Sequence, residues 1–509
     1  MSRTRRAITA AGFQYAQLAL SLVTGVVIFP LTIRAIGVDE FGLWLASGEI
    51  VGYLLLGDLG VFAVLPWLIA ARDGAGDRAG IGLLTANGLS VGVVVALFLS
   101  ATAISLWVLD FAFIGVNPDK WALVREPLIA MLLLSAVGFM LRPFTAVLAG
   151  LQDVVFVGWL SLGQTALTIG LTVGLVIGGG FGLVGLAVAT ALPPVLLGLA
   201  AAGRVVVTHR NAVRLPRPSL VGGCHLVREG FGLWVAGLGV RLLTGSTSLI
   251  LVGLGRTSEA TLYAATGKAA QLLQNLAWIL PDNALIGLSQ VRATGNLEHT
   301  RRAVMSLLVM YLLTSGFIAF AVLAANPALV GVLFGSDLYA GGAVNGIVAM
   351  NLITGSAVTG LFKVVATAEY RMAIGFATLA FGGIATALSL GLGRLGGLVW
   401  VAAGPVIAAV VFAVPVGLWL LQKVYPLTVR EVVLWCFAWA ARSAPFLFAG
   451  AAAGITLETR PVWCFATAAF LGFGYVAFTR PVVAIVPWPE TIRRILERLR
   501  MVPVCAAGL

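Results

Sequence analysis

The sequence is short of charged residues and of cysteine, and each shortage excludes a class of protein. Asp, Glu, Lys and Arg make up only 10% of the 509 residues, whereas a soluble domain has about 25%. The four cysteines show no CxxC spacing, so neither a zinc site nor a disulfide framework is supported. We interpret the adjacent Cys224 and His225 as a solvated loop pair, and we predict no metal site.

The sequence also lacks the motifs and the long loops of an ATP-driven or catalytic protein. No GxxxxGK[ST] phosphate-binding loop is present, and the segments between apolar runs are too short for a soluble catalytic or nucleotide-binding domain. We therefore expect no enzyme, no catalytic residues and no bound cofactor. Transport work would come from an H+ or Na+ gradient, or from the downhill movement of the substrate itself.

Long apolar runs fill most of the chain. Hydrophobic residues account for 60% of it and glycine for another 62 residues, far above the apolar content of about 45–50% that soluble domains show. About 20 such residues cross the hydrocarbon layer of a bilayer as a helix. The runs show no alternation of apolar and polar residues, which argues against a membrane β-barrel. The composition predicts an all-α polytopic membrane protein.

The apolar runs divide into about 14 predicted spans of roughly 20 or more residues each. The first run follows directly on a basic N-terminus and is too long for a signal peptide, so we interpret it as an uncleaved span. The spans lie near 8–33, 42–70, 81–109, 123–148, 154–177, 181–203, 229–254, 260–290, 303–325, 343–367, 372–393, 397–421, 431–455 and 461–480.

The distribution of basic residues indicates the orientation in the membrane. With both termini in the cytoplasm, 23 of the 32 Lys and Arg residues fall in inner segments and 6 in outer segments. This bias follows the positive-inside rule and supports the number of spans. The net charge of +12 therefore belongs to membrane-flanking loops and the tail, and nucleic acid is not an expected partner.

The chain resembles itself at an offset of about 215–220 residues. Residues 43–44 correspond to 262–263, and residues 64–66 correspond to 279–281. Six spans separate the two copies, so both have the same orientation, and parallel repeats of this kind form two lobes around a substrate site. The predicted parts are an N-terminal lobe (1–203), a basic cytoplasmic linker (204–228), a C-terminal lobe (229–423), two further spans (424–480) and a basic amphipathic tail (481–509).

Two pairs of charged residues inside the predicted spans are candidates for function. A charge at the bilayer centre costs about 2.5–3.5 kcal/mol on insertion scales, so such residues face a protein interior or a wet cavity. Glu49 on the second span corresponds to Lys268 on the eighth, which suggests either an outer gate closed by this pair or two charges that are each satisfied within their own lobe. Asp58 and Arg241 both lie near mid-membrane and could form a structural ion pair. Asp58, between two glycines, could instead be a helix-kinking or a cation-coupling site.

Further polar residues accompany these charges on the same helices. Gln271, Gln274 and Asn275 share one face of the eighth span, and Arg241 and Lys268 could hold an anionic group such as pyrophosphate. We expect Asp282 to cap a helix at the interface and Lys363 to anchor an inner helix end.

Three segments resemble a known family. The run from Pro30 to Gly37, the run from Glu40 to Trp44 and the sequence Gly57-Asp58-Leu59-Gly60 together resemble the first-to-second-span signature of Wzx-type polysaccharide flippases. Weaker glycine landmarks at 150–152 and 182–185 agree with it. These O-antigen and exopolysaccharide flippases belong to the multidrug/oligosaccharidyl-lipid/polysaccharide exporter (MOP) superfamily, with the multidrug (MATE) exporters and the lipid II flippases.

The resemblance implies a flippase of the bacterial inner membrane. Its substrate would be an oligosaccharide linked to undecaprenyl pyrophosphate, moved from the inner to the outer leaflet by alternating access for lipopolysaccharide or exopolysaccharide synthesis. Arg34, Arg241 and Lys268 match the type of basic residue that meets the pyrophosphate in this family. The implied partners are the lipid-linked substrate, membrane lipids and the glycan polymerase or export machinery.

Two alternatives remain open at the level of sequence. A cation-coupled small-molecule exporter of the MATE type would be expected to carry an essential carboxylate on the first span, where this chain has none. A membrane-embedded glycan polymerase or ligase would usually need a large outer loop with catalytic groups.

Overall fold

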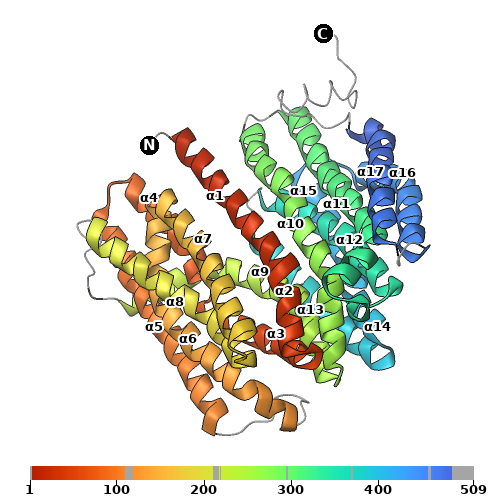
Figure 1. The fold of residues 1–509 in the computed structure, drawn as a ribbon. Coiled ribbons are helices and arrows are strands. Elements are labelled where there is room, and N and C mark those ends of the chain that lie inside the picture. The colour runs from red at the N-terminus through yellow and green to blue at the C-terminus, as the bar shows by residue number, and fades with distance from the viewer. Residues whose placement is uncertain are drawn as a thin grey trace. The chain divides into compact units, whose positions relative to one another are not determined.

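The computed structural model describes residues 3–108, 118–209, 217, 219–293, 296–367, 371–456 and 460–483, and these residues are almost entirely helical (Figure 1). No strand occurs among them. Twelve helical segments are long and apolar enough to cross a membrane, and a bent helix pair brings the number to 13. The predicted all-α polytopic fold is confirmed.

The remaining predicted span, 260–290, corresponds to α10 (Thr257–Ala293), a helix of 37 residues. It is long enough to cross a membrane, but it is not among the twelve helical segments that are also apolar enough. Lys268, Gln271, Asn275 and Asp282 all lie along it, and these side chains lower its mean hydropathy. The polar residues that drew attention to this helix are therefore also the reason why it looks less like an ordinary membrane span.

The first compact unit covers Met1–Thr261. Within it α6 packs against both α5 and α8, α1 packs against α7, and α3 and α4 pack against α9 (Figure 1). Its helices are α1 (Arg3–Val23), α2 (Phe29–Ile36), α3 (Val38–Leu54), α4 (Val61–Gly74), α5 (Arg78–Val108), α6 (Pro118–Gly150), α7 (Val154–Leu171), α8 (Gly182–Thr208) and α9 (Leu220–Gly253).

The segment Pro30–Trp44 is helical over almost its whole length. Pro30 lies in the first turn of α2, where its missing N–H and fixed φ are tolerated. The chain stays helical to Ile36 and resumes at Val38, so Gly37 alone makes the turn, with a φ of 105°. A residue with a side chain rarely adopts that conformation.

The second predicted span is broken in its middle. A short 3₁₀ segment, Leu55–Asp58, separates α3 from α4, and the two helices are bent by 41°. Leu59 and Gly60 at the break have φ values of 50° and 80°. A Cβ on Gly60 would lie 2.3 Å from the carbonyl oxygen of Gly230 on α9, so this glycine allows both the left-handed turn and the close approach of α4 to α9.

Polar side chains cap the N-termini of three long helices. Asp77, Ser219 and Asn296 precede α5, α9 and α11, and each accepts a hydrogen bond from the backbone N–H three residues later. Such caps stabilise a helix by about 1 kcal/mol each. The backbone hydrogen bond from Gly80, helped by Arg72, holds the pKa of Asp77 below its usual value, as expected for a carboxylate at a helix N-terminus.

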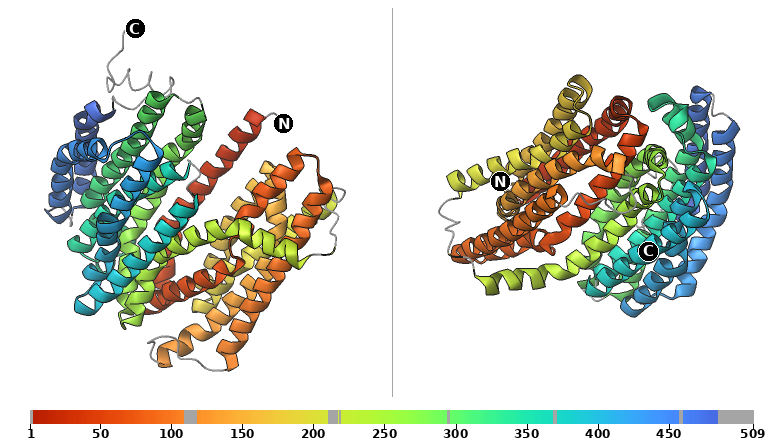
Figure 2. Two further views of the ribbon diagram at one scale, coloured as in Figure 1. Left: turned by 180° about the vertical axis from the view of Figure 1, so that it is seen from behind. Right: turned by 90° about the horizontal axis from the view of Figure 1, so that it is seen from below.

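The second compact unit covers Leu262–Leu509, and α11 is its central helix. α11 packs against α12, α16 and α17, which lie alongside it in Figure 2. Beyond α10, the unit contains α11 (Leu297–Leu333), α12 (Gly342–Ala366), α13 (Arg371–Leu395), α14 (Leu398–Ala408), α15 (Val414–Val424), α16 (Val429–Thr456) and α17 (Pro461–Val483).

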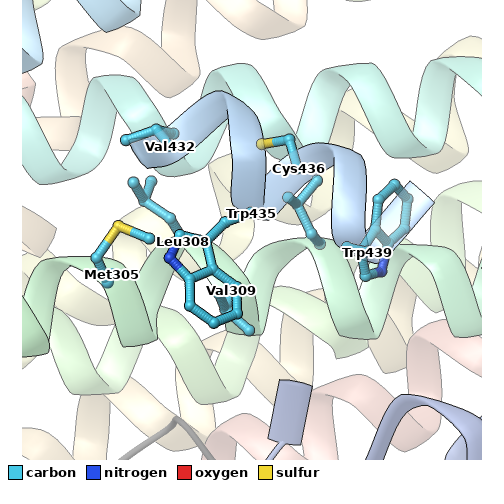
Figure 3. A pocket seen from close by; sticks show the side chains of 8 residues that line it. Met305, Leu308, Val309, Val432, Trp435, Cys436 and Trp439 are labelled. Carbon is cyan, nitrogen blue, oxygen red and sulfur yellow. The ribbon is translucent and has the colours of Figure 1, made fainter. Parts of the chain in front are cut away.

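Aromatic residues and glycines hold α16 and α17 to α11. The Tyr475 hydroxyl on α17 donates to the carbonyl oxygen of Leu313 (3.1 Å) and accepts from the indole N–H of Trp439 (3.3 Å). Gly316 leaves room for both rings, since a Cβ there would lie 2.5 Å from the Tyr475 oxygen. Next to this contact, residues of α11 and α16 line a small apolar crevice, with Trp435 and Trp439 on the α16 side (Figure 3).

Gly454 provides a direct test of the packing of α16 on α11. A Cβ at this position would lie 2.2 Å from the Leu323 carbonyl oxygen, so Gly454→Ala should separate the two helices and lower the apparent melting temperature of the purified protein. Overpacking of this kind costs about 1–3 kcal/mol. Gly383 on α13 has nothing within 4 Å of a Cβ, so Gly383→Ala should leave the melting temperature unchanged or raise it, because alanine favours helix.

Candidate functional site

Glu49 and Arg241 form an ion pair inside the first unit. Glu49 lies on α3 and Arg241 on α9, and the Arg241 Nη2 atom is 2.7 Å from the Glu49 Oε2 atom. Their side chains are 21% and 30% exposed, so water reaches the pair only in part. Two opposite charges that are both largely withdrawn from water stabilise each other more than a surface pair does.

Two glycines make room for this pair. A Cβ on Gly52 would lie 1.7 Å from Arg241 Nη2, and a Cβ on Gly245 would lie 2.0 Å from Glu49 Oε2. Gly52 is three residues after Glu49 on α3, and Gly245 is four residues after Arg241 on α9, so each glycine shares a helix face with one of the charges. The ion pair therefore requires small residues on both helices.

Tyr53 and Ser246 complete a polar group that we call the Glu49 cluster (Glu49, Tyr53, Arg241 and Ser246). The Tyr53 hydroxyl lies 3.0 Å from Ser246 Oγ and donates to the Arg241 carbonyl oxygen at 3.3 Å. The Arg241 guanidinium carbon is 5.8 Å from the centre of the Tyr53 ring, within range of a cation–π contact. The cluster ties the C-terminal part of α3 to α9.

The Arg241 guanidinium has one N–H donor that its neighbours in the described chain do not use. Its Nη2 donates to the Gly48 carbonyl oxygen at 3.1 Å, but its buried Nε–H has no acceptor among the described residues. A buried donor without a partner costs about 1–3 kcal/mol. An acceptor supplied by a ligand would remove that cost.

Asp58 does not pair with Arg241, so the ion-pair alternative for these two residues is wrong. Its Oδ1 accepts from the Gly60 N–H (3.2 Å) and its Oδ2 from the Phe62 N–H (3.3 Å). The carboxylate thus binds the backbone at the start of α4, where helical N–H groups lack partners. Arg142 is near enough to interact electrostatically with Asp58. The break in the span explains the difference, because it supplies N–H groups that a continuous helix would not offer.

The other predicted binding residues are spread over both units. Arg34 is exposed in the last turn of α2. Lys268 is partly buried on α10 in the second unit, and Gln271 and Asn275 are exposed one and two turns further along the same helix. The gate between Glu49 and Lys268 joins residues of two different units and stays a prediction, and Glu49 has Arg241 as its partner within its own unit.

The second unit contains a polar group that the sequence did not indicate, which we call the Asp282 cluster (Asp282, Tyr311 and Lys363). The Lys363 Nζ atom lies 2.8 Å from Asp282 Oδ1 and 2.7 Å from Oδ2, and the Tyr311 hydroxyl also donates to Oδ1. The predicted roles of Asp282 as a helix cap and Lys363 as an anchor are corrected: Asp282 lies inside α10, and the two side chains bind each other. The residues are 29 and 81 positions apart, and only the packing of α10, α11 and α12 brings them together.

No three His, Cys, Asp or Glu side chains are grouped as metal ligands within the part of the chain that the structure describes. Cys224 and Cys436 are free thiols.

Comparison with known proteins identifies the fold. No family model matches the sequence, and no curated protein matches it. Among solved structures, an inward-facing multidrug resistance MATE family transporter of the MOP superfamily matches with a TM-score of 0.59 and 18% identity, covering 80% of this chain and 97% of that one.

Two further structures agree with this match. An outward-facing MATE family transporter of the same superfamily has a TM-score of 0.56 and 18% identity, over 82% of this chain and 94% of that one. A MATE protein in a bent conformation has a TM-score of 0.54 and 15% identity, over 83% and 98%. The chain therefore has the fold of the MATE transporters.

Gly245 tests whether the ion pair depends on the space that glycine leaves. Gly245→Ala should displace the Glu49 carboxylate and destabilise the protein by about 1–3 kcal/mol, seen as a lower apparent melting temperature in detergent. Gly253→Ala on the same helix is the matched control, since nothing lies within 4 Å of a Cβ there. Equal melting temperatures for the two variants would show that the ion pair does not depend on the space left by Gly245.

Exchanging the two charges tests the pair itself. Glu49→Arg should lower the melting temperature strongly, because it opposes two cations where a partly buried pair stood and such a break costs up to about 3–5 kcal/mol. The double variant Glu49→Arg/Arg241→Glu should recover a substantial part of the loss. A double variant as unstable as the sum of its single variants would contradict direct pairing.

Proposed function

We propose that the protein is a flippase that moves an oligosaccharide linked to undecaprenyl pyrophosphate from the inner to the outer leaflet of the bacterial inner membrane. Alternating access is the proposed mechanism. Structures with this fold include one in an inward-facing and one in an outward-facing conformation, and two compact units of similar size suit a movement of one unit against the other.

The open donor on Arg241 is the observation that carries the proposed substrate class. A guanidinium binds phosphate oxygens through several N–H groups at once, and here the buried Nε–H has no acceptor among the described residues. Glu49 holds the group in place and offsets its charge while no substrate is bound. A pyrophosphate oxygen that accepts from Nε–H would add a charge-assisted hydrogen bond without breaking the ion pair.

A cation-coupled multidrug exporter is the second candidate, and the likeness in fold supports it equally well. Such an exporter would be expected to carry a carboxylate on its first span. The described part of the first span has no Asp or Glu, whereas Glu49 and Asp58 follow on the second. This placement, together with the resemblance of the segments from Pro30 to Gly60 to Wzx-type flippases, favours a lipid-linked glycan.

Energy coupling through H+ or Na+ would involve the carboxylates of the second span. Asp58 is bound by backbone N–H groups at the break between α3 and α4, so neutralising it would loosen the start of α4. Glu49 is bound by Arg241, and a change of partner to Lys268 would mark closure of the proposed outer gate. Membrane lipids and the glycan polymerase or export machinery are the proposed partners, with both termini in the cytoplasm.

Deleting the gene tests the function in the cell that carries it. A flippase deletion should accumulate lipid-linked glycan on the inner leaflet and reduce surface glycan, because synthesis of the substrate continues while its export stops. Lipid extraction and surface-glycan staining measure the two effects. Normal surface glycan combined with new sensitivity to cationic drugs would instead identify an exporter.

Complementation with Arg241 variants tests the proposed binding residue. Arg241→Gln should lower glycan export on the order of tenfold or more, since charge-assisted hydrogen bonds contribute about 1.5–3 kcal/mol each. Arg241→Lys should fall in between, because it keeps the charge but loses the planar fork. Arg302→Gln, which changes a side chain that is 73% exposed, is the matched control and should export normally.

A further inference from the structure

The Asp282 cluster brings together three polar side chains that come from three different helices. Asp282 on α10 receives Lys363 from α12 on both carboxylate oxygens and Tyr311 from α11 on one of them. The lysine and the phenol both donate hydrogen bonds to this carboxylate. The two oxygens of Asp282 account for two of the three N–H donors of Lys363.

The surrounding residues fix the positions of the donors. Tyr311 is fully buried, and Gly360 on α12 gives its ring the space, since a Cβ there would lie 2.8 Å from the ring. Lys363 Nζ lies 5.2 Å from the centre of the Trp278 ring, and the Trp278 indole N–H donates to Ser356 Oγ at 3.0 Å. The ammonium is therefore held between a carboxylate and an aromatic face.

The two charged side chains of the cluster are partly exposed to solvent, although Tyr311 is buried. The side chains of Lys363 and Asp282 are 37% and 39% exposed. Lys363 is three residues from the end of α12, about 4.5 Å along a helix axis, which places it at the level of the membrane interface. Phosphate groups of lipids lie at that level.

We propose that Lys363 belongs to a second site that binds a lipid-borne phosphate or pyrophosphate, and that Asp282 occupies the place of the ligand's anionic group until the ligand arrives. Binding is an exchange of partners. The ammonium leaves the carboxylate for a phosphate oxygen, and no covalent bond forms or breaks.

The geometry keeps the free-energy cost of this exchange low. When Lys363 leaves, the Asp282 carboxylate keeps the Tyr311 hydroxyl as a donor and is exposed enough for water to solvate it. Trp278 can keep its contact with the ammonium in both states, because a cation–π contact does not depend on the hydrogen bonds to the carboxylate. The inference rests on the proposed flippase function, for which such a site would bind the pyrophosphate of the substrate.

Calorimetric titration of the purified full-length protein in phosphatidylcholine nanodiscs tests the proposal, with farnesyl pyrophosphate and inorganic pyrophosphate as the probes. Lys363→Met should weaken the binding of both probes about tenfold, and Lys363→Arg should retain most of it. Asp282→Asn should tighten binding about fivefold, because the competing carboxylate is removed. Tyr311→Phe should weaken binding, because the carboxylate then loses the donor that stabilises it after the exchange.

The opposite directions expected for Asp282→Asn and Tyr311→Phe separate an exchange site from a structural ion pair. If Asp282→Asn weakens binding as Lys363→Met does, the pair only holds α10 to α12 and the proposal is overturned. Lys423→Met is the matched control: Lys423 lies on α15 of the same unit, 3.6 Å from the centre of the Trp419 ring, and has no Asp or Glu among its contacts in the described chain. A loss of affinity in Lys423→Met equal to that in Lys363→Met would also overturn it.

Nanodiscs with phosphatidylglycerol distinguish the two sources of phosphate. Weaker probe binding in these discs for the parent protein, but not for Lys363→Met, assigns the site to a phospholipid headgroup, and equal binding in both kinds of disc assigns it to pyrophosphate. The binding measurement uses no glycan. Failure of glycan export with Lys363-dependent binding intact would therefore count against the flippase function and not against this site.

Discussion

The need to compensate charge inside a membrane governs the polar architecture of this protein. A lone carboxylate or ammonium at membrane depth is too costly to leave without a partner, and the structure meets that cost in two ways. Glu49 binds Arg241, and Asp58 binds the free N–H groups of a broken helix. Each solution also joins helices that are distant in sequence, or stabilises a bend within one span.

Glycine is what makes these contacts possible in helices that are otherwise closely packed. Gly52 and Gly245 leave the space that the Glu49–Arg241 pair fills, and Gly360 does the same for Tyr311 in the second unit. Because a single methyl group would collide with a charged side chain or with its support, the high glycine content reflects specific close approaches as well as general membrane composition. In each unit, partly exposed charges rest on a closely packed base, which suits groups that bind and release an anion.

Composition and hydropathy were enough to predict the helical membrane fold, because about 20 apolar residues in a row have few other stable arrangements. The same signals identified Glu49, Asp58 and Arg241 as unusual but did not decide between their possible partners, since depth along a helix says nothing about which face a side chain occupies. The Asp282–Lys363 contact could not be predicted from the sequence for a related reason. The sequence suggested a helix cap for Asp282 and an anchor for Lys363, and only the packing of α10, α11 and α12 shows that the two side chains meet.

Reconstituted transport is the most direct test of the central claim, that a lipid-linked pyrophosphate is the cargo. Proteoliposomes would carry a fluorescent saccharide linked to a short polyprenyl pyrophosphate, and a membrane-impermeant quencher would report its movement between leaflets. The parent protein should move the probe across the bilayer, and Arg241→Gln should move it much more slowly. Movement no faster than in protein-free vesicles, together with gradient-driven export of a cationic dye by the same preparation, would contradict the claim and identify a small-molecule exporter.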